Sequence, residues 1–286
     1  MERAIGIIGG SGLYEMDGLG DISEVEIPTP FGMPSDKIVT GNLGGRKLAF
    51  LPRHGRGHRY LPTEVPYRAN IWALKSLGVE WILSLSAVGS LQHEAKPGEV
   101  VLPDQFIDRA LSRPNTFFGN GLVGHVGMAD PVCGHLADAV MKAGEGLGPK
   151  FHRGGTYVCI EGPTFGTRAE SHLYRSWGAK IVGMTNATEA KLAREAEICY
   201  VTIAMVTDYD CWHEEVVSIE AILEILGKNV NNSKELVRRI VPLIGESRPC
   251  GCAEAAKYAI MTAHDKIPPK TRQAVELLYG KYLKGA

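Results

Sequence analysis

The sequence contains no apolar run approaching the roughly 20 residues that a membrane-spanning helix needs, and its charges almost cancel. Lys and Arg number 31 and Asp and Glu number 32, which gives a formal net charge of −1. A chain without a basic excess has no electrostatic reason to bind nucleic acid or an anionic membrane. The first residues also lack the layout of a signal peptide, so we expect a cytosolic protein.

Cysteine is sparse as well. The chain has 6 cysteines in 286 residues, and no two of them have the C-x-x-C spacing of a zinc ribbon or a thioredoxin motif. Cys159 and Cys199 lie inside apolar runs, and we interpret them as small buried hydrophobic residues. Cys250 and Cys252 could close a small redox-active ring, but we expect two surface thiols in a reducing cytosol.

Two nucleotide-binding motifs are missing too. Residues 4–8 form a short apolar run that leads into Gly9-Gly10-Ser11-Gly12. Glu15 occupies the place of the third glycine in G-x-G-x-x-G, and no G-K-[ST] ending follows, which disfavours a nicotinamide dehydrogenase. A glycine-rich turn can still present backbone amides to an anion, with the Ser11 hydroxyl as a further donor.

Strand-like and helix-like segments alternate along most of the chain. Apolar runs that predict strands lie at 4–8, 81–85, 100–103, 156–160, 181–182 and 198–206, and helical patterns lie at 67–77, 131–147, 167–177, 189–196 and 218–240. Hairpin strands are expected between 22 and 51. The pattern predicts an α/β fold, a single domain over 1–286 with a central mixed, mainly parallel sheet flanked by helices. The tail from about 250 to 286 holds two further helical patterns, split at Pro268-Pro269.

Polar loops follow two of the predicted strands. The loop that begins with Arg53 and His54 is basic and can receive an anion, because arginine forks match phosphate oxygens. A solvated charged loop is the alternative. His54 and His58 have the spacing of a metal pair, but the glycines between and beside them argue against the helix that would join them, and no metal site is expected. Ser86-Ala87-Val88-Gly89-Ser90 is the second loop.

Two carboxylates end the apolar run 198–206. If the strand geometry continues, Asp208 and Asp210 point to the same side, because strand side chains repeat with period two. Like charges in this arrangement are unfavourable for stability alone but suit a ligand that offers donors. Ligands of open parallel sheets bind beyond the carboxyl ends of the strands. The alternative is two solvated turn aspartates.

Taken together, several segments resemble the purine nucleoside phosphorylase superfamily, and within it the 5′-methylthioadenosine phosphorylase branch. They are Ile7-Ile8-Gly9-Gly10-Ser11-Gly12-Leu13, Thr29-Pro30-Phe31-Gly32, Arg53-His54-Gly55, Tyr67-Arg68-Ala69-Asn70-Ile71-Trp72-Ala73-Leu74, Asp104-Gln105-Phe106-Ile107-Asp108-Arg109, Ile160-Glu161-Gly162-Pro163, Arg168-Ala169-Glu170-Ser171 and 207–212. The resemblance implies that inorganic phosphate attacks the ribosyl C1′, that the purine leaves and that 5-methylthioribose 1-phosphate forms. It implies phosphate as co-substrate and no metal or organic cofactor.

The resemblance also implies roles for single residues. The residues that match phosphate-site positions are Ser11, Arg53, His54, Ser86, Ala87 and Thr185. Asp208 and Asp210 match the base-recognition pair and are the expected catalytic residues. Residues that match other substrate-binding positions are Met184 beneath the ribose, Gly166, and Val217 and Ile219 on the apolar wall around the methylthio group. His125 matches a histidine that a neighbouring subunit lends to this pocket, which implies a homotrimer.

Two alternatives to this reading stay open. The 6-oxopurine branch places Asn where this chain has Asp, because O6 is a hydrogen-bond acceptor, so the carboxylate favours adenine. A 6-oxopurine nucleoside or 5′-methylthioinosine phosphorylase is the alternative within the family. A nucleoside-binding module without turnover is the alternative from another class.

Overall fold

The computed structural model describes residues 3–10, 12–213 and 219–283. The strands are β1 (Ala4–Gly9), β2 (Gly20–Val25), β3 (Ile38–Leu43), β4 (Arg46–Pro52), β5 (Val79–Ser90), β6 (Val100–Leu102), β7 (Gln105–Asp108), β8 (Phe151–Arg153), β9 (Thr156–Cys159), β10 (Ala179–Gly183) and β11 (Cys199–Tyr209). The helices are α1 (Tyr67–Ser76), α2 (Gly134–Gly144), α3 (Arg168–Ser176), α4 (Asn186–Glu195), α5 (Ile219–Ile240) and α6 (Pro269–Leu283), with short 3-10 turns η1 (Val241–Leu243), η2 (Gly251–Glu254) and η3 (His264–Lys266).

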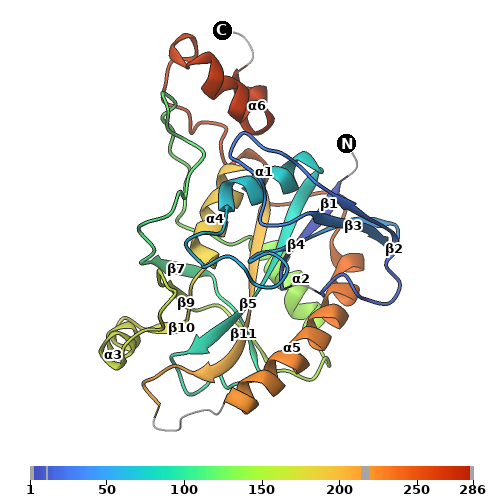
Figure 1. The fold of residues 1–286 in the computed structure, drawn as a ribbon, viewed down its shortest axis with the longest axis vertical. Helices are drawn as coiled ribbons and strands as arrows, with labels where there is room; N and C mark the ends of the chain where they lie inside the picture. The colour runs from blue at the N-terminus through green and yellow to red at the C-terminus, as the bar shows by residue number, and fades with distance from the viewer. Residues whose placement is uncertain (1–2, 11, 214–218, 284–286) are drawn as a thin grey trace.

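The strands form one mixed sheet through the middle of the molecule (Figure 1). β5 lies at its centre and pairs in parallel with β1 on one side and β11 on the other. Among the described residues, six strand pairs are parallel and four antiparallel, which confirms the predicted mixed, mainly parallel sheet. The early hairpin is β3–β4, and its turn Gly44-Gly45 has φ of +56° and +78°, which glycine adopts without the steric cost of a side chain.

Helices cover both faces of the sheet. On one face α2 and α5 pack on Ile5, Ile7, Leu83, Val201 and Ile203. On the other face α1 and α4 pack on Ala4, Ile8, Ile82, Ile198 and Tyr200, and α6 packs against α1. Because consecutive strand residues point to opposite faces and both faces are covered, the central strands read as continuous apolar runs in the sequence.

Two predicted elements are wrong. The segment Ser86-Ala87-Val88-Gly89-Ser90 is not a loop, because β5 continues to Ser90, where Gly89 and Ser90 pair with β10. In the described part of the tail, the first helical pattern forms the 3-10 turns η2 and η3, and the second forms the α-helix α6. β7 and β8 are strands that the sequence did not indicate.

The expected surface exposure of Cys250 and Cys252 is also wrong. Cys252 is 5% exposed and belongs to the core cluster under α2 and α5, while Cys250 is half-buried and packs against that cluster. Cys159 and Cys199 are buried, as expected.

None of the helices in the described ranges is both long enough and apolar enough to cross a bilayer.

The last residue of α4, Glu195, is buried and fixes the loop before α2. Its carboxylate accepts hydrogen bonds from Thr116 Oγ1 at 2.7 Å and from the Phe117 N–H at 2.6 Å. Burial raises the pKa of Glu195 to about 7, against the two hydrogen bonds. The folded state therefore holds a proton that the unfolded state has released between pH 4.5 and 7.

We expect this proton to make stability fall as pH rises. The raised pKa stabilises the fold fully below pH 4.5, and that contribution, about 3 kcal/mol, is lost as pH rises through 7. Glu195→Gln keeps a donor for Thr116 and an acceptor for Phe117 without a charge. Urea unfolding should find the variant equal to the parent chain at pH 5 and more stable at pH 8. If the variant and the parent chain differ in free energy of unfolding by the same amount at pH 5 and pH 8, the raised pKa of Glu195 is contradicted.

Candidate active site

Asp208 and Asp210 lie on the same side of the end of β11, beside Gly89 of β5. A Cβ atom at Gly89 would lie 3.4 Å from Asp210 Cβ and 3.6 Å from Asp208 Oδ2. Asp208 pairs with Gly89 after a register shift that follows Val206, and the Asp210 N–H donates to the Ser90 carbonyl at 2.9 Å. The extension of both strands thus brings the two carboxylates together, as the period-two argument predicted.

The environment of Asp208 raises the pKa of its carboxyl group. Burial raises its pKa above the usual range for Asp, a hydrogen bond from Thr207 opposes the shift, and the charge of Asp210 adds to it. The Thr207 hydroxyl donates to Asp208 Oδ1 at 2.6 Å and fixes the carboxyl group. A raised pKa is the direction that a general acid requires.

Neighbouring groups hold the strand end in place. Trp212 Nε1 donates to the Ser90 carbonyl at 2.8 Å. The Cys211 thiol lies 3.4 Å from the Gly166 carbonyl, so Gly166 contacts the residue that follows Asp210. Of the residues assigned to substrate binding, the structure brings Asp208 and Asp210 together beside Gly89.

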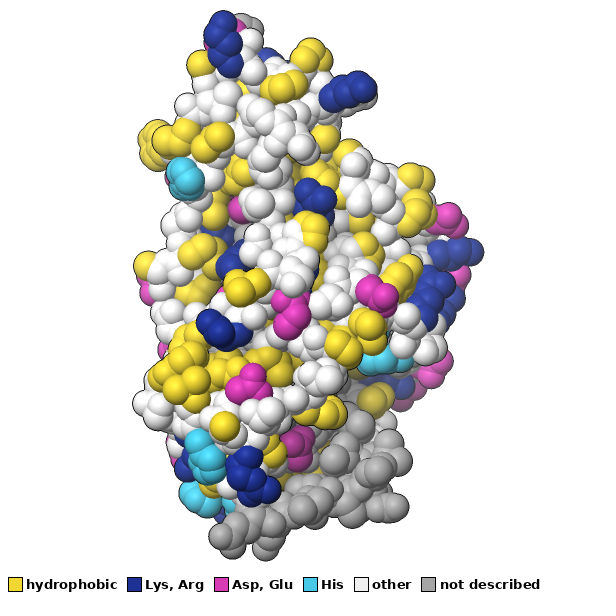
Figure 2. Space-filling view, turned by 60° about the vertical axis from the view of Figure 1, so that its left-hand side comes forward, with side chains coloured by type: hydrophobic (Ala, Val, Ile, Leu, Met, Phe, Trp, Pro, Cys, Tyr) yellow, Lys and Arg dark blue, Asp and Glu magenta, His cyan; other side chains and the backbone are white. Residues whose placement is uncertain are grey.

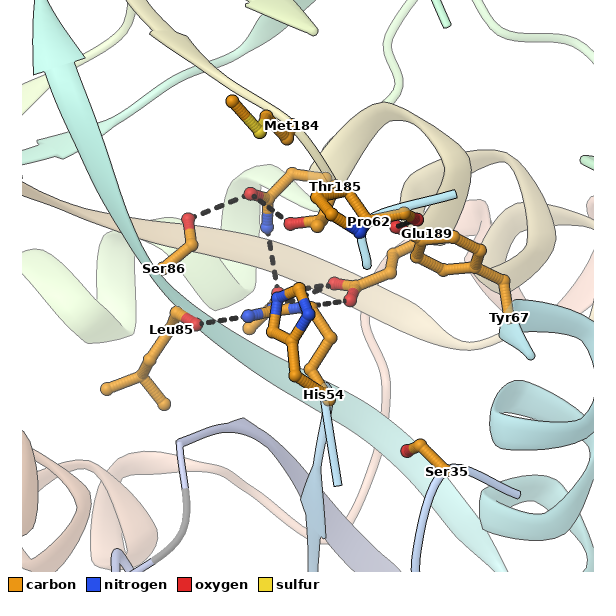
Figure 3. A network of polar contacts seen from close by, with 12 residues as sticks. Ser35, His54, Pro62, Tyr67, Leu85, Ser86, Met184, Thr185 and Glu189 are labelled. Carbon is orange, nitrogen blue, oxygen red and sulfur yellow. Dashed lines mark hydrogen bonds and ion pairs between the residues drawn. The ribbon is translucent and has the colours of Figure 1, made fainter. Parts of the chain in front are cut away.

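A second polar group lies earlier on β5, around the amino-terminal end of α4 (Figure 3). Ser86 Oγ donates to Asn186 Oδ1 at 2.8 Å, and Thr185 Oγ1 lies 3.4 Å from the same oxygen. Ala87 is exposed although it belongs to the central strand of the sheet. Three of the predicted phosphate-site residues, Ser86, Ala87 and Thr185, therefore lie around the N-terminus of α4, where free N–H groups favour anions.

Arg53 lies beneath this group in a buried ion pair with Glu189. The two side chains are 4% and 2% exposed, and Arg53 Nε lies 2.5 Å from Glu189 Oε1. Arg53 also donates to Glu189 Oε2, the Leu85 carbonyl and Ser84 Oγ. These contacts use four of the five guanidinium N–H groups, so at most one can reach a ligand. Burial opposes the charge of Arg53, but Glu189 outweighs it and raises the pKa of the guanidinium.

His54 is neutral at pH 7. Burial, followed by the charge of Arg53, lowers its pKa to about 4. Its Nδ1 lies 2.8 Å from the Tyr60 carbonyl, which can only accept, so the proton is on Nδ1 and Nε2 is an acceptor. The rings of His54 and His58 stack with centroids 4.3 Å apart.

Met184 lies beside the first polar group, directly before Thr185. It follows β10, whose Val182 pairs with Gly89, and Arg113 Nη1 donates to its carbonyl at 2.6 Å. Its Sδ would be 2.6 Å from a Cβ at Gly162, so only glycine leaves room for the side chain there. In Figure 3, Ser86, Met184 and Thr185 lie together on one side of the ion pair.

The spacing of the two polar groups suits a nucleoside. Ser86 and Ala87 precede Gly89 on β5 by two or three residues, or about 7–10 Å at the rise of a strand. An anion at the first group and a planar base at the second would leave a pentose-sized gap between them. Met184 borders that gap.

The sequence reasoning missed four buried polar residues that support the first group. Asn186 Nδ2 donates to Ser84 Oγ and to the Tyr200 hydroxyl, both at 2.9 Å, and the Tyr200 hydroxyl donates to Glu189 at 3.0 Å. Ser84 and Tyr200 interrupt apolar strands. Because buried polar groups need hydrogen-bond partners, a polar residue inside an apolar strand indicates a buried polar network, and this was the signal available in the sequence.

Four predicted site residues are not united with the others. Ser11 and Val217 lie outside the described residues, and Ile219 begins α5, although its side chain is not among those described. His125 is exposed, and its N–H donates to the Ala259 carbonyl at 2.9 Å. No interaction found among the described residues joins His125 to either polar group of this chain.

Comparison with known proteins gives a consistent picture. Residues 4–242 match the family described as "Phosphorylase superfamily". The chain is 56% identical over 286 residues to the S-methyl-5′-thioadenosine phosphorylase of Geobacter sulfurreducens, covering 99% of this chain and 100% of that one.

Two solved structures are similar in fold. A methylthioadenosine phosphorylase from an Antarctic soil metagenomic library has a TM-score of 0.94 at 49% identity, over 97% of this chain and 99% of that one. The methylthioadenosine phosphorylase of Schistosoma mansoni in complex with adenine has a TM-score of 0.83 at 39% identity, over 89% and 96% of the two chains.

Proposed function

The chain belongs to the phosphorylase superfamily, and we propose that it cleaves 5′-methylthioadenosine with inorganic phosphate to adenine and 5-methylthioribose 1-phosphate. It is an enzyme of the pentosyltransferase class. The observation that carries the substrate assignment is the pair of carboxylates beside Gly89 of β5. Two or three residues earlier on the same strand, hydroxyl groups lie around the N-terminus of α4, and this separation suits a pentose. The relatives named for the same reaction support it.

The aspartates suit an adenine leaving group. Adenine presents an N6 amino group and gains a proton at N7 as it leaves, and both groups are donors toward carboxylates. We assign Asp208 to N7 as the general acid, because burial raises its pKa, and Asp210 to the amino group. A carboxylate that faces O6 of hypoxanthine would be repelled and unpaired, at a cost on the order of 1–3 kcal/mol.

The opposite end suits the phosphate nucleophile. We assign Ser86, Thr185 and the Ala87 backbone to the phosphate oxygens, with Ser11 from the glycine-rich turn. Arg53 supplies positive charge from beneath, and His54 Nε2 can accept a hydrogen bond from hydrogen phosphate. The sugar passes through an oxocarbenium-like state, so catalysis consists mainly of positioning the phosphate and stabilising charge while Met184 packs on the ribose. Phosphate is the co-substrate, and the reaction uses no organic cofactor.

We propose that the enzyme is a homotrimer in which a neighbouring subunit completes the 5′ pocket. His125 is exposed on the segment bonded to the tail, where it can reach a neighbouring copy, and Gly166, Val217 and Ile219 would complete the pocket. Large apolar side chains that are exposed include Leu111, Phe165, Tyr258 and Met261. Figure 2 shows hydrophobic side chains gathered across one face, and large exposed apolar patches mark interaction surfaces.

We also propose that residues 1–286 form one domain of a cytoplasmic enzyme. The packing of the tail supports a single domain. Residues Val275, Leu278 and Tyr279 of α6 belong to the same core cluster as residues of β1 and α1, and Trp72 Nε1 donates to the Ala274 carbonyl.

The test is chromatographic detection of adenine from 5′-methylthioadenosine, with and without phosphate. We expect adenine release only with phosphate, and kcat/KM for 5′-methylthioinosine lower by roughly ten- to a hundredfold. Base release without phosphate would identify a hydrolase. Equal turnover of the two nucleosides would contradict the assignment of the aspartates.

A further inference from the structure

Four of the six cysteines gather at one point of the core. Cys133 precedes α2, Cys199 begins β11, and Cys250 and Cys252 flank Gly251 at the start of η2. Their four sulfur atoms all lie within 4.8 Å of one another. Cys250 Sγ lies 3.7 Å from Cys133 Sγ and 3.4 Å from Cys199 Sγ.

These distances fit one tetrahedral metal ion better than disulfides. A zinc ion binds thiolate sulfur at about 2.3 Å, which places the sulfurs of a tetrahedral site about 3.8 Å apart. A disulfide needs about 2.05 Å, and Cys250 lies at nearly equal distances from two candidate partners. Four sulfur atoms that all lie within 4.8 Å of one another can occupy the four ligand positions of a tetrahedral site.

The surroundings suit a closed, structural site. Cys133, Cys199 and Cys252 are 4%, 1% and 5% exposed, whereas the half-buried Cys250 leaves a route for the ion. Arg194 Nη1 lies 4.0 Å from Cys252 Sγ. Four thiolates on a dication carry two negative charges in excess, and the guanidinium partly offsets them.

We propose that Cys133, Cys199, Cys250 and Cys252 bind one Zn²⁺. Soft thiolates in a tetrahedral set select zinc or iron, and zinc is the redox-inert choice for a site that only holds segments together. Cys199 and Asp208 are nine residues apart on β11, or about 30 Å, so the ion takes no part in the cleavage.

The ion would anchor the tail to the sheet. The tail beyond the cysteines carries Ala259 and Met261, whose backbones bond to His125 and Val123 at 2.9 Å. Gly124 and Ile260 form an isolated bridge in the same place. The zinc site therefore supports the segment that presents His125.

The proposal is tested by the metal content of the full chain, purified under reducing conditions without a chelator. We expect one zinc per chain by elemental mass spectrometry. Cys250→Ser/Cys252→Ser should lose the zinc, and Cys159→Ser, a buried cysteine outside the cluster, should keep it. Cobalt loaded into the unmodified chain should show the thiolate charge-transfer and intense visible bands of a tetrahedral sulfur site, which requires no variant to fold.

Stability gives a second readout. A chelator that strips the zinc should lower the unfolding temperature, and added zinc should restore it. Three results would overturn the proposal: a reduced chain that neither contains nor takes up zinc or cobalt, bound iron in place of zinc, or disulfides among these cysteines in protein purified without oxygen. None of these readouts depends on catalysis, so they stand whether or not methylthioadenosine is the substrate.

Discussion

Asp208→Asn is expected to lower kcat/KM for 5′-methylthioadenosine by roughly 10²- to 10⁴-fold, the range for loss of a positioned general acid. Asn keeps the size of the side chain but cannot give a proton to N7. The raised pKa of Asp208 means that its ionised form is unfavourable in the fold, so the variant should be at least as stable as the parent chain near neutral pH. Steady-state kinetics and urea unfolding of the same preparations measure both effects.

The pH profile adds a readout that a merely structural role would not change. Activity that needs protonated Asp208 declines as pH rises through its pKa, and this alkaline limb should be absent from the residual activity of the variant. Asp210→Asn is the matched control. It should retain much more turnover but lose preference for the amino over the oxo purine. Full activity of Asp208→Asn, or unchanged selectivity of Asp210→Asn, would refute the corresponding role.

Glu189→Gln is expected to destabilise the fold by about 3–5 kcal/mol, because it leaves the buried Arg53 guanidinium without its charged partner. Glu189 also accepts hydrogen bonds from Ser84 and Tyr200, so the substitution disturbs the whole network beneath the phosphate site. The free energy of unfolding in urea measures the loss.

Glu235→Gln is the control for a surface ion pair. Glu235 pairs with Arg238 and Arg239 on α5, where the side chains are between 34% and 51% exposed, and its loss should cost under about 1 kcal/mol. The double variant Arg53→Met/Glu189→Leu should recover part of the lost stability but no activity, because it removes both buried charges. A cost for Glu189→Gln no larger than that for Glu235→Gln would show that Arg53 has another compensating partner.

The order of strands and helices was predictable because it depends on local periodicity. The central strands are buried on both faces, so β1 and the first halves of β5 and β11 appear as continuous apolar runs. The second half of β5 was not predictable. Gly89 and Ser90 remain strand because β10, some 90 residues later in the chain, pairs with them, and nothing in their own composition favours a strand over a loop.

The candidate site divides in the same way. Asp208 and Asp210 could be placed together because two residues along a strand return to the same side. The ion pair of Arg53 with Glu189 joins residues 136 positions apart, and the cysteine cluster draws on positions 133, 199, 250 and 252. The missing C-x-x-C pattern argued against a metal, but ligands contributed by three separate segments have no spacing rule.

By itself, the sequence determined the alternation of strand and helix, the near-neutral charge and the paired carboxylates at a strand end, since each depends on residues close together in the chain. Only the tertiary structure decided which buried carboxylate pairs with Arg53, where β5 ends and which cysteine thiols lie close together in the core. Those contacts depend on the register in which distant strands pair, and that register is fixed by the packing of both sheet faces together.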